Sequence, residues 1–136
     1  MKFGVVKEIW QQDIQALHRI RERHIKNQTA LTNEIRGLLQ EYGIAIPQGI
    51  NKLRSFIADT DSPEKKILSR TIRIALLDLH AELLNIRENI ERLDKELSEV
   101  FKNSEVCKRI AAVEGVGVIT ATALIAVMPP AHMFAN

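Results

Sequence analysis

The feature that most constrains this chain is a long run of regularly spaced aliphatic residues between Glu64 and Lys102. Their steps of four and three keep one stripe of a helix turned toward a partner helix. At about 1.5 Å per residue such a helix is too long to bury its own stripe, so we expect a coiled coil. The predicted coiled-coil and dimer seam consists of Ile72, Leu76, Leu79, Leu83, Ile86, Ile90, Leu93, Leu97 and Val100.

A second long helix is predicted upstream, beginning at about Ile9. Apolar residues share one heptad register at its two ends, whereas polar residues occupy the middle of that register. The seam either shifts there onto Ile20 and Ile25, which is the interpretation we favour, or stays polar. The apolar ends of the register are Trp10, Ile14, Leu17, Leu31, Ile35, Leu38 and Tyr42, and its polar middle is Arg21, His24 and Gln28.

A turn and a short helix are predicted at residues 43–63. Gly43 suits a left-handed helix end, and the spacing of Ile50, Leu53 and Ile57 is helical. Ser62 before Pro63 is typical of a helix start. We therefore predict an all-α fold, in which residues 9–102 form a long antiparallel coiled-coil helical hairpin after a connector at 1–8.

Further apolar residues of the second helix, Ile74, Leu77 and Leu84, lie off its main seam. They widen the apolar face beyond what one partner helix would cover. Two such hairpins packed together would cover it, so a homodimer is predicted.

The composition excludes several classes of protein. The 136 residues include 19 Lys and Arg against 17 Asp and Glu, so overall charge says little about partners. The single Cys107 excludes an internal disulfide. No apolar run reaches the roughly 20 residues of a membrane span, and the start is unlike a signal peptide. A cytoplasmic protein without a membrane partner is expected.

A basic cluster on the first helix is the first candidate for nucleic-acid contact. Arg19, Arg21, Arg23 and Lys26 are accompanied by Glu22 as the only acidic residue. Such a cluster can neutralise phosphates. A solvated helix face is the alternative interpretation.

Residues 103–128 carry the most specific local pattern, a helix-hairpin-helix. Gly115, Val116 and Gly117 form a Gly-hydrophobic-Gly turn, which lets backbone amides at the start of the second helix approach a phosphate. Lys108 and Arg109 are the nearby basic residues, whereas Glu114 would repel a phosphate. A purely structural hairpin is the alternative. Residues 129–136 are predicted to be a tail.

The chain resembles the central part of insertion-sequence transposases of the DEDD class, which include pilin-gene invertases and bridge-RNA-guided recombinases. The resemblance rests on the stretches from Gln11 to Gly49 and from Arg109 to Met128, and covers nearly the whole chain. One departure is Glu114, which stands where the family commonly has a proline. The resemblance implies a role in DNA transposition, with DNA or a guide RNA as partner.

The catalytic domains of that family would lie outside this chain. The resemblance implies a RuvC-like nuclease domain with four acidic ligands for a divalent metal such as Mg²⁺ before Met1, and a serine-nucleophile domain after Asn136. Within the chain we expect no catalytic residues, metal site, cofactor or small-molecule substrate, because its acidic residues and histidines lack the spacing of a site. The alternative function is a purely structural coiled-coil module without a nucleic-acid role.

Overall fold

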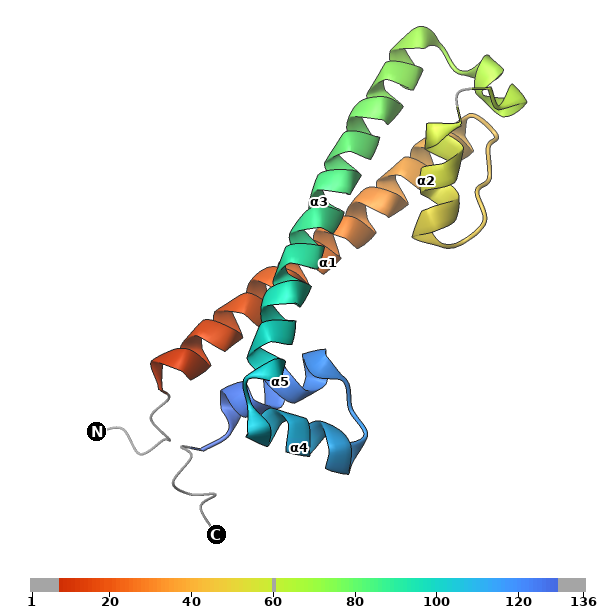
Figure 1. Cartoon of the computed structure of the whole chain (residues 1–136). Helices are drawn as coiled ribbons and strands as arrows, with labels where there is room; N and C mark the ends of the chain where they lie inside the picture. Colours follow the sequence, from red (N-terminus) through yellow and green to blue (C-terminus); the bar gives the residue numbers. More distant parts are fainter. Residues whose placement is uncertain (1–7, 60, 130–136) are drawn as a thin grey trace. The chain divides into compact units, whose positions relative to one another are not determined.

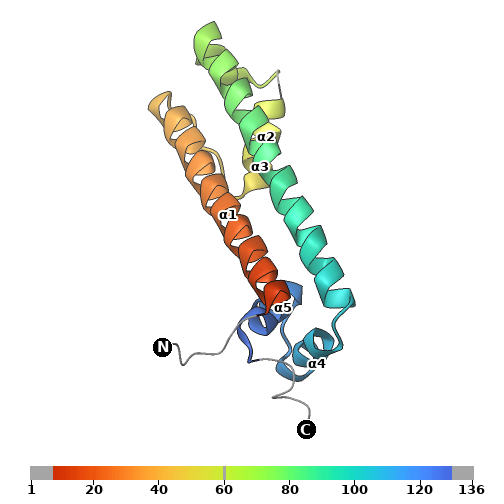
Figure 2. The same cartoon turned by 90° about the vertical axis from the view of Figure 1, so that its left-hand side faces the viewer.

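The computed structural model describes residues 8–59 and 61–129, and these contain helices and no strands. The two longest helices, α1 and α3, pack antiparallel and a short helical pair follows them, which confirms the predicted all-α class (Figures 1 and 2). Residues 1–7 of the expected connector and 130–136 of the expected tail lie outside the described residues. The elements are α1 (Ile9–Glu41), α2 (Ile50–Ala58), the 3₁₀ helix η1 (Pro63–Ile67), α3 (Arg70–Lys102), α4 (Glu105–Glu114) and α5 (Val118–Val127).

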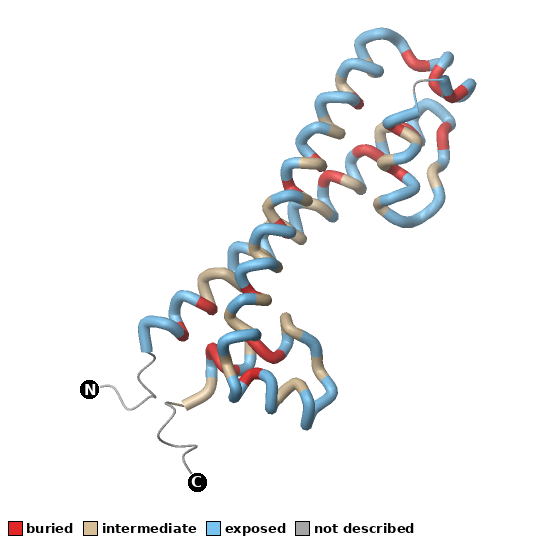
Figure 3. Tube along the Cα trace, in the orientation of Figure 1, coloured by how far each residue is buried: buried red, intermediate tan, exposed pale blue. Residues whose placement is uncertain are grey.

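The chain divides into two compact units, and α1 and α3 contribute to both. Unit 1 combines Met1–Arg23 with Ile90–Asn136, and unit 2 is His24–Asn89. Along α1 and α3, buried and exposed residues alternate in short steps, as expected for helices that bury one face (Figure 3). No individual helix among the described residues has the length and hydropathy to cross a membrane, although α4 and α5 pass that test as a bent pair.

In unit 2, the predicted left-handed end of α1 is present. Gly43 has a φ of 78°, and its N–H donates to the Gln40 carbonyl at 2.9 Å. The N–H of Ile44 reaches back to the Leu39 carbonyl at 3.0 Å. These two bonds satisfy carbonyls that the end of a helix leaves without partners, and the burial of Leu39 and Ile44 seals the turn.

The loop after α1 is held by an arginine that the sequence analysis did not single out. The guanidinium of Arg36 donates to the carbonyls of Ile46 at 2.8 Å, Pro47 at 3.0 Å and Gly49 at 2.8 Å. Gly49 is the residue that precedes α2, so this clamp fixes where α2 begins. The guanidinium of Arg36 therefore has a structural role, because it holds the loop between α1 and α2.

The second long helix begins later than predicted. The apolar pattern was expected to be helical from Glu64, but α3 starts at Arg70 and η1 precedes it. Leu68 is extended, and the Ser69 hydroxyl accepts from the Ile72 N–H at 3.2 Å, so Ser69 caps α3. The Ser62 hydroxyl bonds to the Glu64 carboxylate at 2.7 Å instead of capping a helix.

The break before α3 is explained by Lys65, whose side chain is buried. Its ammonium donates to the carbonyl of Ile57 at 2.8 Å and to that of Asp59, and lies 5.0 Å from the centre of the Phe56 ring. These carbonyls close α2, where a cation also complements the helix dipole. Burial lowers the pKa of Lys65, and the Asp59 carboxylate partly opposes that shift.

The basic side chains of Arg54 in α2 and Lys65 in η1 lie near His80 of α3. Nε2 of His80 and Nε of Arg54 are buried, and neither has a hydrogen-bond partner among the described residues. Burial lowers the pKa of His80, and the charges of Arg54 and Lys65 lower it further. The imidazole is therefore held neutral inside unit 2.

The predicted seam of α3 is covered to different degrees. Its members in unit 2 include Leu76, Leu83 and Ile86, which are buried, and Ile72 and Leu79, which are half-buried. In unit 1, Ile90 and Leu97 are buried, whereas Leu93 and Val100 are half-buried. The opposing apolar residues of α1 in unit 2 are Leu31, Ile35 and Leu39, all buried.

The core of unit 1 joins parts of four helices. Ser104 caps α4, because its hydroxyl accepts from the Cys107 N–H at 3.1 Å. Burial raises the pKa of the Cys107 thiol. The buried members of this core are Ile14, Leu97, Cys107, Ala121, Ile125 and Ala126.

The favoured shift of the α1 seam onto Ile20 and Ile25 is wrong for Ile20. That side chain is 41% exposed, whereas neighbouring Arg21 is half-buried. The polar register therefore continues through this part of α1. The reason is that α3 presents the Asp94 carboxylate to this part of α1, where it pairs with Arg21.

We expect Lys65→Met to destabilise the protein by about 1–3 kcal/mol, because the buried Ile57 carbonyl and the partly buried Asp59 carbonyl at the end of α2 lose their donor. Urea denaturation followed by circular dichroism measures the loss. Lys66→Met is the matched control, since Lys66 is the exposed neighbour and its removal should change little. Equal losses in the two variants would contradict the role assigned to Lys65.

Candidate nucleic-acid interface

The predicted hairpin between α4 and α5 forms in unit 1. The two helices are bent by 118° relative to each other at the turn. Gly115 ends α4 in the left-handed region at a φ of 67°, and Gly117 precedes α5 with extended backbone at a φ of −88° and a ψ of −174°. Glu114, which stands where the resembling family commonly has proline, is the last residue of α4.

The turn is open on its outer side. A Cβ atom added to Gly115 or Gly117 would meet nothing within 4 Å. No side chain caps α5, and its first intrahelical bond runs from the Ala121 N–H to the Gly117 carbonyl at 2.9 Å. The amides that precede Ala121 therefore point out of the start of α5, at the positive end of its dipole.

The charges near the turn are few. Lys108 lies 3.6 Å from the Glu105 carboxylate, in an exposed pair within α4. Arg109 and Glu114 are exposed. The first turn of α5 carries no acidic residue. An anion at the turn would thus meet backbone amides before it met a cationic side chain.

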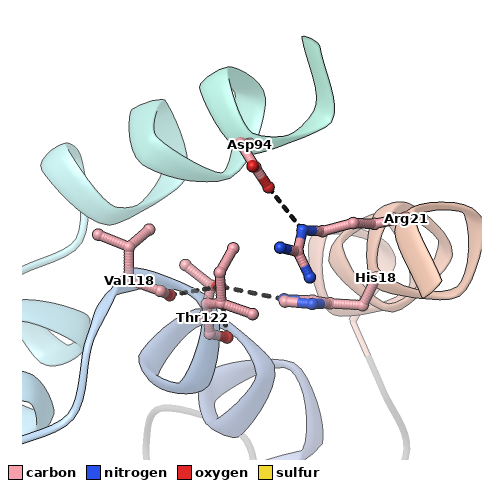
Figure 4. Close-up of polar contacts among 6 residues, drawn as sticks. His18, Arg21, Asp94, Val118 and Thr122 are labelled. Carbon is pink, nitrogen blue, oxygen red and sulfur yellow. Dashed lines mark hydrogen bonds and ion pairs between the residues drawn. The ribbon is translucent and has the colours of Figure 1, made fainter. Parts of the chain in front are cut away.

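The basic cluster of α1 divides between two faces of the helix. Arg19 and Arg23 are exposed and one helical turn apart. Lys26 is also exposed and belongs to unit 2. Arg21 points the other way: its Nε donates to the Asp94 carboxylate of α3 at 2.5 Å (Figure 4). The side chains of Arg21 and Asp94 are 24% and 42% exposed, so the pair is partly shielded from water.

His18 lies beside Arg21 and turns toward α5 (Figure 4). Its Nε2 is 3.0 Å from the Thr122 hydroxyl, whose oxygen is itself 2.8 Å from the Val118 carbonyl. Since the hydroxyl proton is used within α5, Nε2 of His18 must be the donor in the first contact. Burial lowers the pKa of His18, and the charge of Arg21 lowers it further.

Gln11 ties the start of α1 to the end of α5. Its Nε2 donates to the carbonyls of Ile125 at 3.1 Å and Met128 at 2.7 Å, and its Oε1 accepts from the Glu8 N–H at 3.0 Å. The sequence analysis missed this buried glutamine. The heptad spacing of Gln11 and His18, continued by Arg21, was the available signal for a polar stripe.

No three His, Cys, Asp or Glu side chains within residues 8–59 and 61–129 are arranged to hold a metal ion. The candidate interface consists of backbone amides, exposed arginines and polar contacts of α1 with α3 and α5 (Figure 4).

Over nearly its whole length the chain is homologous to one segment of insertion-sequence transposases. It is 40% identical over 134 residues to the transposase for insertion sequence element IS1111A of Coxiella burnetii, a match that covers 98% of this chain and 37% of the relative. It is 31% identical over 114 residues to the transposase for insertion sequence element IS1328 of Yersinia enterocolitica, covering 84% of this chain and 33% of the relative.

The chain thus spans about a third of the length of these curated relatives. No protein-family model matches it, and no solved structure does. The relatives agree with the family resemblance at the level of the transposase class.

The half-buried histidines predict a pH dependence of stability. The pKa of each is below the ordinary value of 6.5 in the folded chain, so unfolded His18 and His80 bind protons that the folded ones do not. Their contribution to stability is therefore fully present above about pH 6.5 and is lost as the pH falls through the lowered pKa values. Thermal unfolding between about pH 7 and pH 5 should show this fall, because most carboxylates titrate at lower pH. A variant with both His18→Gln and His80→Gln should show a flatter profile, and an unchanged slope would contradict the assignment.

Proposed function

We propose that this chain is the segment of an insertion-sequence transposase that contacts the phosphates of nucleic acid through its helical hairpin. The observation that carries the proposal is the open turn at Gly115–Gly117, which presents uncapped amides at the start of α5. Such amides bind phosphate oxygens without reading base sequence. Homology to transposases supports nucleic acid as the partner.

The exposed arginines of α1 extend this proposal. Arg19 and Arg23 share one side of the helix, where each can neutralise a phosphate. Arg21 contributes less, because Asp94 already offsets its charge. Lys26, Lys108 and Arg109 remain proposed contacts, and Val116 is proposed to hold the turn that carries Gly115 and Gly117.

The activity of the whole protein is proposed from the family. The DEDD-class resemblance implies a RuvC-like nuclease domain that binds a divalent metal and a separate serine-nucleophile domain, both outside this chain. The described segment would then support DNA transposition by spacing these domains and by holding DNA or a guide RNA. A cytoplasmic location follows from the same proposal.

The homodimer also remains a proposal. Since α1 covers part of the α3 seam within one chain, a second copy would have to pair through another surface. Sedimentation as a monomer at micromolar concentration would argue against the dimer. A purely structural role remains the second candidate function, and it predicts no binding to nucleic acid even at low salt.

We expect Gly117→Asn to weaken binding to duplex DNA of arbitrary sequence several-fold. The asparagine oxygen caps the amides of α5 from within the chain, so stability should be unchanged or slightly higher. Filter binding at low salt and thermal unfolding measure the two effects. Gly37→Ala, on an exposed position of α1, should also stabilise the chain but leave binding unchanged. Unaltered binding in Gly117→Asn would rule out the amide contact.

Replacing Arg19 and Arg23 together with Gln should weaken DNA binding and lower the slope of log K against log salt by about 1.8, at about 0.9 per phosphate. Filter binding over a salt series measures this slope. Arg21→Gln is the matched control on the same helix, and we expect it to reduce stability more than binding. If Arg21→Gln lowered the slope as much as the pair does, the assignment of faces would be wrong.

A further inference from the structure

Unit 2 carries an exposed surface that the proposed function does not use. We define the outer face as Lys66 and Ile67 of η1 with Arg70, Arg73, Ile74 and Leu77 of α3. Ile67 is 61% exposed, Ile74 is 50% and Leu77 is 55%. Steps of three and four place the α3 members on one side of that helix, away from buried Leu76 and Leu83. The outer face is therefore both apolar and accessible.

The charged residues of the outer face are cations, and the nearest acidic residues in the sequence, Glu64 and Asp78, lie at its two ends. Residues 65–77 include Lys65, Lys66, Arg70 and Arg73 and no acidic residue, although the whole chain has a net charge of only +2. The cations of the outer face, Lys66, Arg70 and Arg73, are exposed. Apolar side chains framed by cations form the pattern of an interface with an apolar centre and a charged rim.

A small pocket opens beside the outer face, between α2 and α3. It has a volume of about 160 Å³ and is lined by Ile57, Lys65, Arg73, Leu76 and Leu77. A cavity of about 150 Å³ with apolar walls is large enough to bind benzene, so this pocket suits one large apolar side chain. Lys65 donates two of its three N–H groups to the carbonyls of Ile57 and Asp59. The third N–H group can donate to a ligand.

Three occupants can be compared by their chemistry. Nucleic acid would satisfy Arg70 and Arg73 but would leave the exposed apolar side chains uncovered. A second copy paired symmetrically through the outer face would bring like charges together, because this face has no acidic residue. An acidic segment with an apolar side chain satisfies both features.

We propose that the outer face is a docking surface for an acidic amphipathic peptide segment, which places one large apolar side chain in the pocket between α2 and α3. Its carboxylates pair with Arg70 and Arg73 at the rim of that pocket. This surface lies wholly in unit 2, so it functions independently of the hairpin in unit 1.

Three labelled synthetic peptides test the proposal against the full chain by fluorescence anisotropy. The first is an amphipathic helix with Glu on its flanks and a central Phe, the second replaces each Glu with Lys, and the third replaces the central Phe with Ser. We expect only the first to bind tightly, with an affinity that decreases as salt is added. Equal binding of the acidic and basic peptides, or no binding of the first, would overturn the proposal.

Variants locate the binding. Arg70→Glu combined with Arg73→Glu should weaken the first peptide about tenfold or more, as should Leu77→Ser. Lys95→Glu, at an exposed position of α3 in unit 1, is a charge-reversal control and should leave binding unchanged. Circular dichroism checks that each variant is folded. Displacement of the peptide by single-stranded nucleic acid, or concentration-dependent self-association abolished by Leu77→Ser, would assign the face to another occupant and overturn the proposal. Hairpin variants such as Gly117→Asn should not affect the peptide.

Discussion

The short helices depend on hydrogen bonds that long polar side chains donate to backbone carbonyls. Gln11 donates to the end of α5, Lys65 to the end of α2, and Arg36 to the loop that leads into α2. Isolated helices of this length are marginal in water, and their terminal carbonyls are costly to bury without donors. The bonds of Gln11 and Lys65 therefore both position a short helix and offset the burial of its end, whereas those of Arg36 hold the loop before α2.

The charges of α1 show how one helix can serve two purposes. The stretch from His18 to Lys26, which suggests a basic surface, also supplies polar contacts within unit 1. Arg21 is committed to Asp94 and His18 to Thr122, whereas Arg19 and Arg23 are exposed. The basic cluster thus contains one arginine with a structural role, Arg21, and two exposed arginines, Arg19 and Arg23. Only the exposed arginines can contact a partner. Exposure, rather than composition, decides which arginines carry the proposed function.

The geometry of the hairpin and the similarity to transposases are two independent grounds for the proposed function. The left-handed Gly115 and the extended Gly117 create a turn with open space outside it, and α5 begins there without a cap. Nucleic acid is the partner that we propose for this turn. The chain spans about a third of the length of the relatives, and we propose contact and spacing as its part.

The sequence by itself determined the helical class, the two long helices, the left-handed end at Gly43 and the glycine turn, since each depends on residues close together in the chain. It could not place Gln11 or His18 against α5, or start α3 at Arg70. Those outcomes depend on partners far away in the sequence: Ile125 lies 114 residues from Gln11, and Thr122 lies 104 residues from His18. Heptad spacing indicates that a face is buried but not what chemistry faces it. Tertiary structure alone decided that a carboxylate, a hydroxyl and backbone carbonyls would face the polar stripe of α1, and so left Ile20 exposed.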